Sequence, residues 1–330
     1  NNLLKLMDYA GNFKYFTIGS IVLSAVSACL ALVPFVYIWK IIDEVLSVMP
    51  DYTKATNIED YGFTAVRYAL NAMCVYFCAL ACSHIGGFRT VANIRKSCVA
   101  KVMRLPLGHI ETEGSGKIRK IIIDSTASMD NYLEHIVPDR TVAVATPIAM
   151  IVLLMYFDWK IGLLCLATIV GGCLIMGAFM VGPRLKKDME AYNIALENMT
   201  KEAVEYVRGI PVVKTFGQSV FSFKKLKKAI DDYAKFTISY TQQFRVPMTS
   251  FTIVINASFA ILIAVALYHN VTVADHELLT NIMFYIIFTP IIAVTLNKLM
   301  YSSEAGMIVS TAFSRIDSVL DVEEKIIKKK

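Results

Sequence analysis

Charged side chains are scarce in this chain. Asp, Glu, Lys and Arg make up 18% of its 330 residues, whereas soluble domains carry about 25%. Hydrophobic residues account for 56%, and the mean hydropathy is +0.53. A water-soluble protein of this composition would expose large apolar patches. The scarcity of charge therefore argues against a soluble domain and favours a membrane protein.

The chain also lacks the motifs of a nucleotide-binding enzyme. The stretch "EGSGKIRKIIIDS" at 113–125 has the small residues and the lysine of a phosphate-binding loop. A Walker A loop, however, needs a glycine five positions before its Gly-Lys pair and a Ser or Thr after it. Those two positions hold Glu111 and Ile118, and no Leu-Ser-Gly-Gly-Gln signature or acidic Walker B strand is present. We therefore expect no ATP hydrolysis by this chain alone.

Secretory signals and disulfide pairs are missing too. The first fourteen residues are polar and mixed, and the first apolar run is too long for a cleaved signal. No two of the seven cysteines suggest a structural disulfide. Cys74, Cys78 and Cys82 recur every four residues with His84 just beyond, a stripe that suits soft metal ions such as copper. Thiols in apolar surroundings act as small hydrophobic residues, so we predict packing there and no metal.

Long apolar segments, in contrast, are abundant. Six reach or approach the roughly 20 residues that a helix needs to cross a bilayer, and hydrocarbon requires each of them to be helical. Pro34, Pro147 and Pro290 lie inside these segments, where kinks are tolerated. Residues 157–160 form a tight turn between two of them, with an aromatic residue on each side. The predicted spans cover residues 15–41, 64–88, 141–157, 159–182, 246–268 and 279–300.

The segments between the spans differ in positive charge. Residues 43–60 carry one Lys and five acidic residues, and residues 269–277 carry no Lys or Arg. Residues 89–140 carry nine Lys and Arg, and residues 184–245 carry twelve. Because Lys and Arg are enriched on the cytoplasmic side, we expect both long segments and both termini in the cytoplasm, below a plasma or inner membrane. The net charge of +6 thus reflects topology and requires no nucleic-acid partner.

The two long segments have the apolar spacing of helices. In the first, Val91, Ile94, Cys98, Val102 and Leu105 follow one another at intervals of three or four residues. We therefore expect the spans to continue as rods into the cytoplasm, each pair of rods ending in a turn far from the membrane. The second segment repeats the pattern at Met189, Tyr192, Ala195, Met199, Ala203 and Tyr206.

Each turn between rods has its own motif. "LPLGHIETEGSG" at 105–116 breaks the first pair, and "YVRGIPVVKTFGQ" at 206–218 breaks the second. After the glycines of the first turn, Ile118, Ile121 and Ile122 predict a short amphipathic helix at the tip. Such a helix suits docking into a groove on another protein.

With these motifs in this order, the chain resembles the transmembrane domain of an ATP-binding cassette (ABC) transporter of the exporter fold. Residues 105–139 are similar to the first intracellular loop of that family, residues 195–218 to the second, and residues 310–324 to the lead-in to its nucleotide-binding domain. The resemblance covers essentially the whole chain as one domain. It implies an all-α membrane protein with six transmembrane helices and two coupling-helix loops.

The resemblance also implies partners and a mechanism. ATP and Mg²⁺ would bind on nucleotide-binding domains, which grip the tips and rock two six-span halves between inward- and outward-open states. Besides the bilayer, the expected partners are therefore a second half, identical or different, and two nucleotide-binding domains. Those domains belong either to another chain or, as we favour, to a continuation missing from this sequence. The expected docking residues are Gly116, Ile118, Ile121, Ile122, Asp124, Glu205, Gly209, Ile210, Lys214 and Phe216.

Polar residues inside spans are costly and therefore informative. Lys298 lies near the inner end of its span, where snorkelling to the interface is the alternative, and Asn71 and Asn256 are also typical of helix–helix contacts. Tyr285 and Phe288 either form an aromatic wall or contact lipid and helices. The candidate substrate-cavity residues are Asn71, Asn256, Asn297, Lys298 and Tyr301.

Two classes of function remain open. The favoured one is a translocation domain that exports a lipid, peptide, drug or other small molecule, driven by ATP on its partner. "FTPIIAVTLNKLMY" at 288–301 and the basic first loop also look similar to a branch of the family that includes siderophore importers. The rival class is a cassette-free pore or scaffold that uses the same fold.

Overall fold

The chain folds into helices joined by short connections. The computed structural model describes residues 2–180, 183–215, 224–268 and 276–322, and within these ranges it contains no β-strand. The all-α membrane class predicted from the sequence is thus confirmed. The elements are α1 (Asn2–Ala10), η1 (Gly11–Phe13), α2 (Lys14–Leu30), α3 (Val33–Ser47), η2 (Tyr52–Lys54), α4 (Ile58–Val102), α5 (Leu107–Glu113), α6 (Ser115–Asn131), η3 (Tyr132–Ile136), α7 (Val137–Phe157), α8 (Trp159–Met180), α9 (Pro183–Thr215), α10 (Lys224–Tyr268) and α11 (His276–Leu320).

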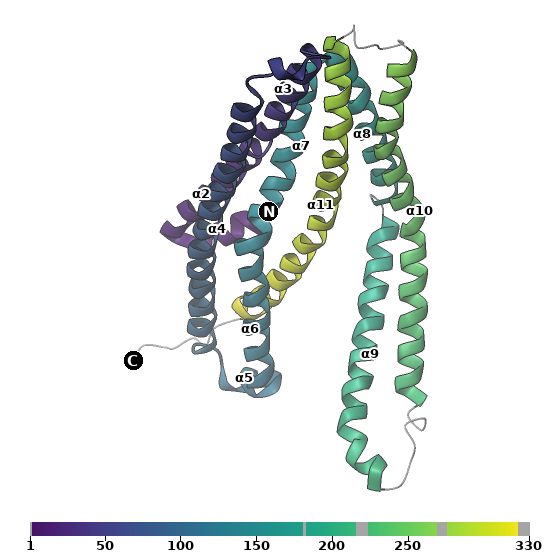
Figure 1. Cartoon of the computed structure of the whole chain (residues 1–330). Helices are drawn as coiled ribbons and strands as arrows, with labels where there is room; N and C mark the ends of the chain where they lie inside the picture. The colour runs from purple at the N-terminus through teal and green to yellow at the C-terminus, as the bar shows by residue number, and fades with distance from the viewer. Residues whose placement is uncertain (1, 181–182, 216–223, 269–275, 323–330) are drawn as a thin grey trace. The chain divides into compact units, whose positions relative to one another are not determined.

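The helices form two compact units. The first takes in the chain up to Gly162 and again from Leu262, and the second is Leu163–Ile261. In the first unit, α4 packs along α2 and α3, α7 packs on α2, and α11 contacts α3, α6 and α7 (Figure 1). The first unit thus combines the N-terminal helices α1 to α7 with the C-terminal helix α11.

Several helices are much longer than a membrane is thick. α4, α10 and α11 each have 45 residues, which is about 68 Å at 1.5 Å per residue. The hydrocarbon core of a bilayer is only about 30 Å thick. Since α4 runs from Ile58 past Gly86 to Val102 without a break, the prediction that the second span continues as a rod is confirmed.

Five helical stretches are long and apolar enough to cross a membrane by length and composition. The sixth predicted span begins in α11, whose apolar part among the described residues is His276–Ile292. The count of six spans therefore stays a prediction. The five stretches are Leu3–Ser47, Ile58–Val102, Ser115–Phe157, Trp159–Ala178 and Lys224–Tyr268.

The first predicted span, 15–41, is not one regular helix. α2 ends at Leu30 and α3 begins at Val33, with a turn between them. Pro34 lies in the first turn of α3, where a missing N–H removes no helical hydrogen bond. The sequence placed Pro34 inside a single span, where a kink is tolerated, whereas the proline lies at the start of a new helix.

Beyond the predicted spans, the first unit has a hydrophobic core of its own. Leu6 of α1, Ile94 of α4, Met129 of α6 and Ile316 of α11 are at most 1% exposed in one cluster. The apolar stripe predicted on the first rod supplies part of this core, because Val91, Ile94, Cys98 and Leu105 are all buried. Burial at the predicted spacing shows that the rods pack as a helical bundle rather than as loops.

In the second unit, α8 contacts α10 at a glycine, and α9 contacts α10 through a cluster of tyrosines. A Cβ on Gly172 of α8 would lie 2.9 Å from Cγ1 of Ile255 on α10, so the two helices approach closely there. Tyr192 of α9 shares a hydrogen bond of 3.0 Å with the hydroxyl of Tyr233 and stacks on Tyr240, both on α10. The predicted stripe of the second rod is half-buried at Tyr192, Ala195, Met199, Ala203 and Tyr206, and the side chain of Met189 lies outside the described part.

Candidate functional site

The first tip is a short helix held between two long ones. α4 ends at Val102, α5 follows, and α6 begins at Ser115 (Figure 1). Pro106 is the N-cap residue of α5, with an extended ψ of 138°, and its missing N–H prevents it from continuing α4. Gly114 ends α5 with a φ of +82°, a backbone conformation that favours glycine because it has no Cβ. Two residues that resist regular helix therefore set the length of α5.

Lys117, the lysine of the stretch that resembles a phosphate-binding loop, forms an ion pair within this turn. Lys117 Nζ donates a hydrogen bond of 2.6 Å to Glu113 Oε2. The hydrogen bond and the positive charge hold the pKa of the Glu113 carboxyl below its usual range. Lys117 thus pairs with an acidic side chain one helical turn away.

A cavity of about 350 Å³ lies between α4, α5 and α6. Arg95, at its edge, donates from Nε to Thr126 Oγ1 at 2.9 Å and so ties α4 to α6. The apolar part of the lining leaves room for a small hydrophobic group at the tip. This lining is formed mainly by Val99, Val102, Ile110, Ile118, Ile122 and Ile123.

The short helix lies earlier in the chain than the sequence predicted. We expected it after Gly116, but those residues begin the 17-residue α6, and the short helix is α5. Ile118 is only 6% exposed, and Ile121 and Ile122 are half-buried, whereas Gly116 and Asp124 are exposed. The isoleucines are therefore mostly withdrawn from the surface of the first unit, because they belong to the apolar face of a long helix.

The most exposed apolar side chains of the tip are Met103 and Leu107. Met103 is 82% exposed and Leu107 is 70% exposed. The sequence analysis missed both. The signal was available in Pro106, which cannot continue α4, and in Gly114 eight positions later. Together they mark the bounds of a two-turn helix.

Comparison with known protein families matches residues 17–292 to the ABC transporter transmembrane region. The match covers most of the chain. The chain belongs to this family. A region of this kind spans the membrane and is not itself the catalytic part of the transporter.

The chain also resembles parts of longer transport proteins. It is 29% identical over 163 residues, 49% of its length, to the mycobactin import ATP-binding/permease protein IrtA of Mycolicibacterium smegmatis, of which the match covers 18%. The protein of that name from Mycobacterium tuberculosis is 28% identical over 66% of the chain and 24% of the relative. The ATP-dependent lipid A-core flippase of Methylobacillus flagellatus is 22% identical over 42% of the chain and 24% of the relative. The chain spans at most about a quarter of these relatives.

In the second unit of this ABC transmembrane region, most of the predicted turn at 206–218 is helical. α9 continues through Gly209, Ile210 and Pro211 to Thr215, so the motif residues up to that point are helical. Glu205 is exposed, and Gly209 and Ile210 are half-buried. The side chain of Lys214 and the whole of Phe216 lie outside the described residues. The docking role of these residues stays a prediction.

Ile118→Asp tests the burial of the α6 isoleucines. The variant places a carboxylate at a buried position in a lining that is apolar apart from Arg95, Arg119 and Ser115, and burying a charge among apolar side chains is among the most destabilising substitutions. We expect a loss on the order of 3 kcal/mol in stability, measured as a lower unfolding temperature in detergent. Lys120→Asp, at an exposed position of the same helix, is the matched control and should unfold like the parent protein. Equal stability of both variants would contradict the inward placement of Ile118.

The structure describes the side chains of two of the five predicted cavity residues of the ABC transmembrane region. Asn71 on α4 is exposed in the first unit. Asn256 is exposed in the second unit and donates from Nδ2 to the carbonyl of Thr252 at 2.7 Å, within its own helix. Asn297, Lys298 and Tyr301 lie along α11, and their side chains are outside the described part. A cavity role for these five residues stays a prediction.

The aromatic wall, in contrast, is internal to the first unit. Tyr285 and Phe288 are both 0% exposed. Phe288 stacks on Phe284 and meets Phe35 edge-on. Tyr285 donates its hydroxyl hydrogen to a backbone carbonyl at the end of α7, that of Leu154. These aromatic rings therefore fasten α11 to α3 and α7 and do not line an open wall.

The cysteine stripe lies on a more exposed face of α4 than predicted. Cys74 and Cys78 are exposed and Cys82 is half-buried. They do not fill the interior of the first unit, and the predicted packing role stays a prediction. With Asn71 they share one face at spacings of three and four residues.

Proposed function

We propose that the chain is the translocation domain of an ATP-driven transporter that works by alternating access. Its membership of the ABC transmembrane family carries this proposal. The long helices support it, because α4 is about 38 Å longer than the hydrocarbon core of a bilayer is thick. A rod of that length ending in α5 can transmit movement from a cytoplasmic partner to the membrane.

The partners follow from what the domain needs. ATP and Mg²⁺ bind on nucleotide-binding domains, which dock at the two tips, and a second six-span half completes the pathway. Exposed apolar residues on α4, among them Leu70, Met73 and Phe77, support burial of this helix by lipid or by the second half. We place the protein in the plasma or inner membrane with both termini in the cytoplasm, because the long segments carry most of the Lys and Arg.

For the cargo, we propose export of a lipid, peptide, drug or similar small molecule. The relative that is named an ATP-dependent lipid A-core flippase supports an amphipathic cargo. The relatives named for mycobactin import favour a second candidate, the import of siderophore-like solutes. The siderophore resemblance of the 288–301 stretch points the same way but does not outweigh the first candidate.

The decisive experiment measures transport by the complete transporter in proteoliposomes. We expect ATP-dependent movement of cargo and stimulation of ATP hydrolysis by the right cargo class. Fluorescent lipids, ferric siderophores and amphipathic drugs are supplied in turn on the cytoplasmic or the opposite side. Cargo leaving the cytoplasmic side supports export, and cargo entering it supports the import candidate. ATP-independent leakage of all solutes would favour a pore. Absence of movement with every cargo would favour a scaffold.

A further inference from the structure

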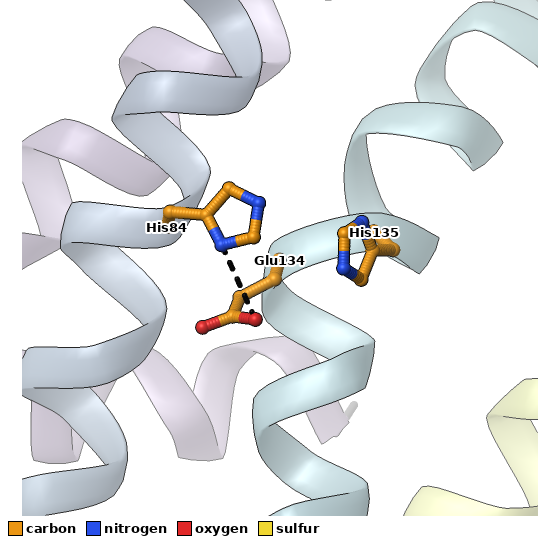
Figure 2. Close-up of side chains that lie close together, drawn as sticks. All are labelled: His84, Glu134 and His135. Atoms are coloured by element: carbon orange, nitrogen blue, oxygen red, sulfur yellow. Dashed lines mark ion pairs between the residues drawn. The ribbon is translucent and has the colours of Figure 1, made fainter.

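Two histidines and a glutamate converge where α4 passes η3. His84 comes from α4, while Glu134 and His135 are neighbours in η3 (Figure 2). His84 Nδ1 lies 3.2 Å from Glu134 Oε2, and the rings of His84 and His135 have centroids 5.0 Å apart. One nitrogen or oxygen atom of each residue lies within 4.8 Å of those of the others. Three strong metal-ligating groups therefore meet on two elements that are fifty residues apart in the chain.

The local backbone holds Glu134 in this position. η3 is a single π-helical turn, and such turns recur at functional sites because they displace side chains from their regular register. Ser83 Oγ of α4 donates to the backbone carbonyl of Glu134 at 2.7 Å. Gly87 leaves the space for the side chain, because a Cβ there would lie 2.8 Å from Glu134 Cγ. Ser83 thus holds the backbone of Glu134, and Gly87 leaves space for its side chain.

The carboxylate is buried without sufficient partners. Glu134 is 7% exposed, and its Oε1 has no hydrogen bond in the described structure. Asp130, four residues earlier in the chain and so one helical turn away, also has a buried oxygen, Oδ1, without a hydrogen bond there. Buried carboxylate oxygens are normally paired or bound to a cation. A bound cation would satisfy both oxygens, as would a proton shared between the two carboxyl groups.

Two imidazoles and one carboxylate are the ligand set of a borderline divalent metal ion. Zn²⁺ binds histidine nitrogen at about 2.0–2.1 Å and carboxylate oxygen at about 2.0–2.2 Å, usually with tetrahedral geometry. Ligand atoms around such an ion lie about 3.3 Å apart by that geometry, which agrees with the 3.2 Å between His84 and Glu134. His135 is exposed and His84 is partly exposed, so an ion can enter from the surface of the unit.

We propose that His84, Glu134 and His135 bind a divalent transition-metal ion of the Zn²⁺ type, which joins α4 to η3. The three protein ligands leave a fourth position for water or another ligand. The thiols of Cys74, Cys78 and Cys82 are not needed as ligands of this ion. The proposal does not depend on the cargo or on the direction of transport.

The test is Zn²⁺ binding by the purified complete transporter after removal of metals with a chelator. Cys74, Cys78 and Cys82 are replaced by Ala in the parent for this experiment, because free thiols bind Zn²⁺ themselves. Competition with a chromogenic chelator should show one ion for each copy of the chain. Glu134→Gln and His135→Ala should each weaken binding at least about tenfold, the lower end of the range known even for residues that only support metal ligands. His135→Ala changes an exposed side chain, so it keeps the proposal testable if Glu134→Gln fails to fold.

Two further readouts separate a metal site from a plain ion pair. His109→Ala, on α5 and outside the cluster, should bind Zn²⁺ like the parent. Co²⁺ in place of Zn²⁺ should give the visible absorption of nitrogen and oxygen ligands without a thiolate band. Binding that is absent, or that is equally tight in His135→Ala, would overturn the proposal and leave a His84–Glu134 ion pair only.

Discussion

Leu107→Asp is expected to separate ATP hydrolysis from transport in the complete transporter. Leu107 is the apolar residue that α5 exposes most, at 70%. If α5 docks into a groove of the nucleotide-binding domain, the new carboxylate must lose its water there without gaining a partner. Truncating a central residue of such an interface costs 2 kcal/mol or more, so we expect transported cargo per ATP to fall at least about tenfold. The measurement compares cargo flux and phosphate release in the same proteoliposomes.

The control for this variant is Ile238→Asp. Ile238 is 58% exposed and lies inside α10, away from both ends of that helix. Like Leu107, Ile238 is an exposed aliphatic side chain on a helix, but it does not belong to α5. Coupling should remain at the parent level, and both variants should unfold at the parent temperature. Normal coupling in Leu107→Asp would remove α5 as the docking element and leave the α6 isoleucines of the original prediction.

The sequence predicted helices well and their ends less well. Apolar spacing located the rods because burial of one face repeats every three or four residues, and Val91, Ile94 and Cys98 are indeed buried. The break between α2 and α3 was missed. A proline tolerated inside a span and a proline that begins a new helix look the same in sequence, since both depend on how neighbouring helices pack.

The candidate site was only partly predictable. The sequence identified the first tip but assigned the contact surface to the isoleucines of α6. Their inward direction depends on α4, to which α6 is tied by the Arg95–Thr126 hydrogen bond. Likewise, the sequence joined His84 to a cysteine stripe at helical spacing. Its observed neighbours, Glu134 and His135, come from a distant segment that a π-helical turn brings into register, and no local pattern encodes that meeting.

Gly162→Ala is expected to destabilise the turn between α7 and α8. A Cβ at Gly162 would lie 2.7 Å from the carbonyl oxygen of Leu154, which is backbone and has little freedom to move. The turn is held on both sides, because Asp158 Oδ1 accepts hydrogen bonds from the amides of Lys160 and Ile161 at 2.8 and 3.2 Å. The hydroxyl oxygen of Tyr285 also accepts a hydrogen bond from the Asp158 amide at 3.2 Å. Overpacking of this kind costs about 1–3 kcal/mol.

Gly177→Ala gives the opposite expectation on the same helix, α8. A Cβ at Gly177 would meet no atom within 4 Å, and alanine in a helix is more favourable than glycine by about 0.5–1 kcal/mol. The unfolding temperature of the purified protein in detergent should therefore fall for Gly162→Ala and stay or rise for Gly177→Ala. The pair separates a steric clash from the general preference of helices for alanine, because the second effect acts equally in both variants. If Gly162→Ala were as stable as the parent, the close approach of α8 to the last turn of α7 would be wrong. The tight Phe157–Lys160 turn predicted from the sequence would then lack its structural basis.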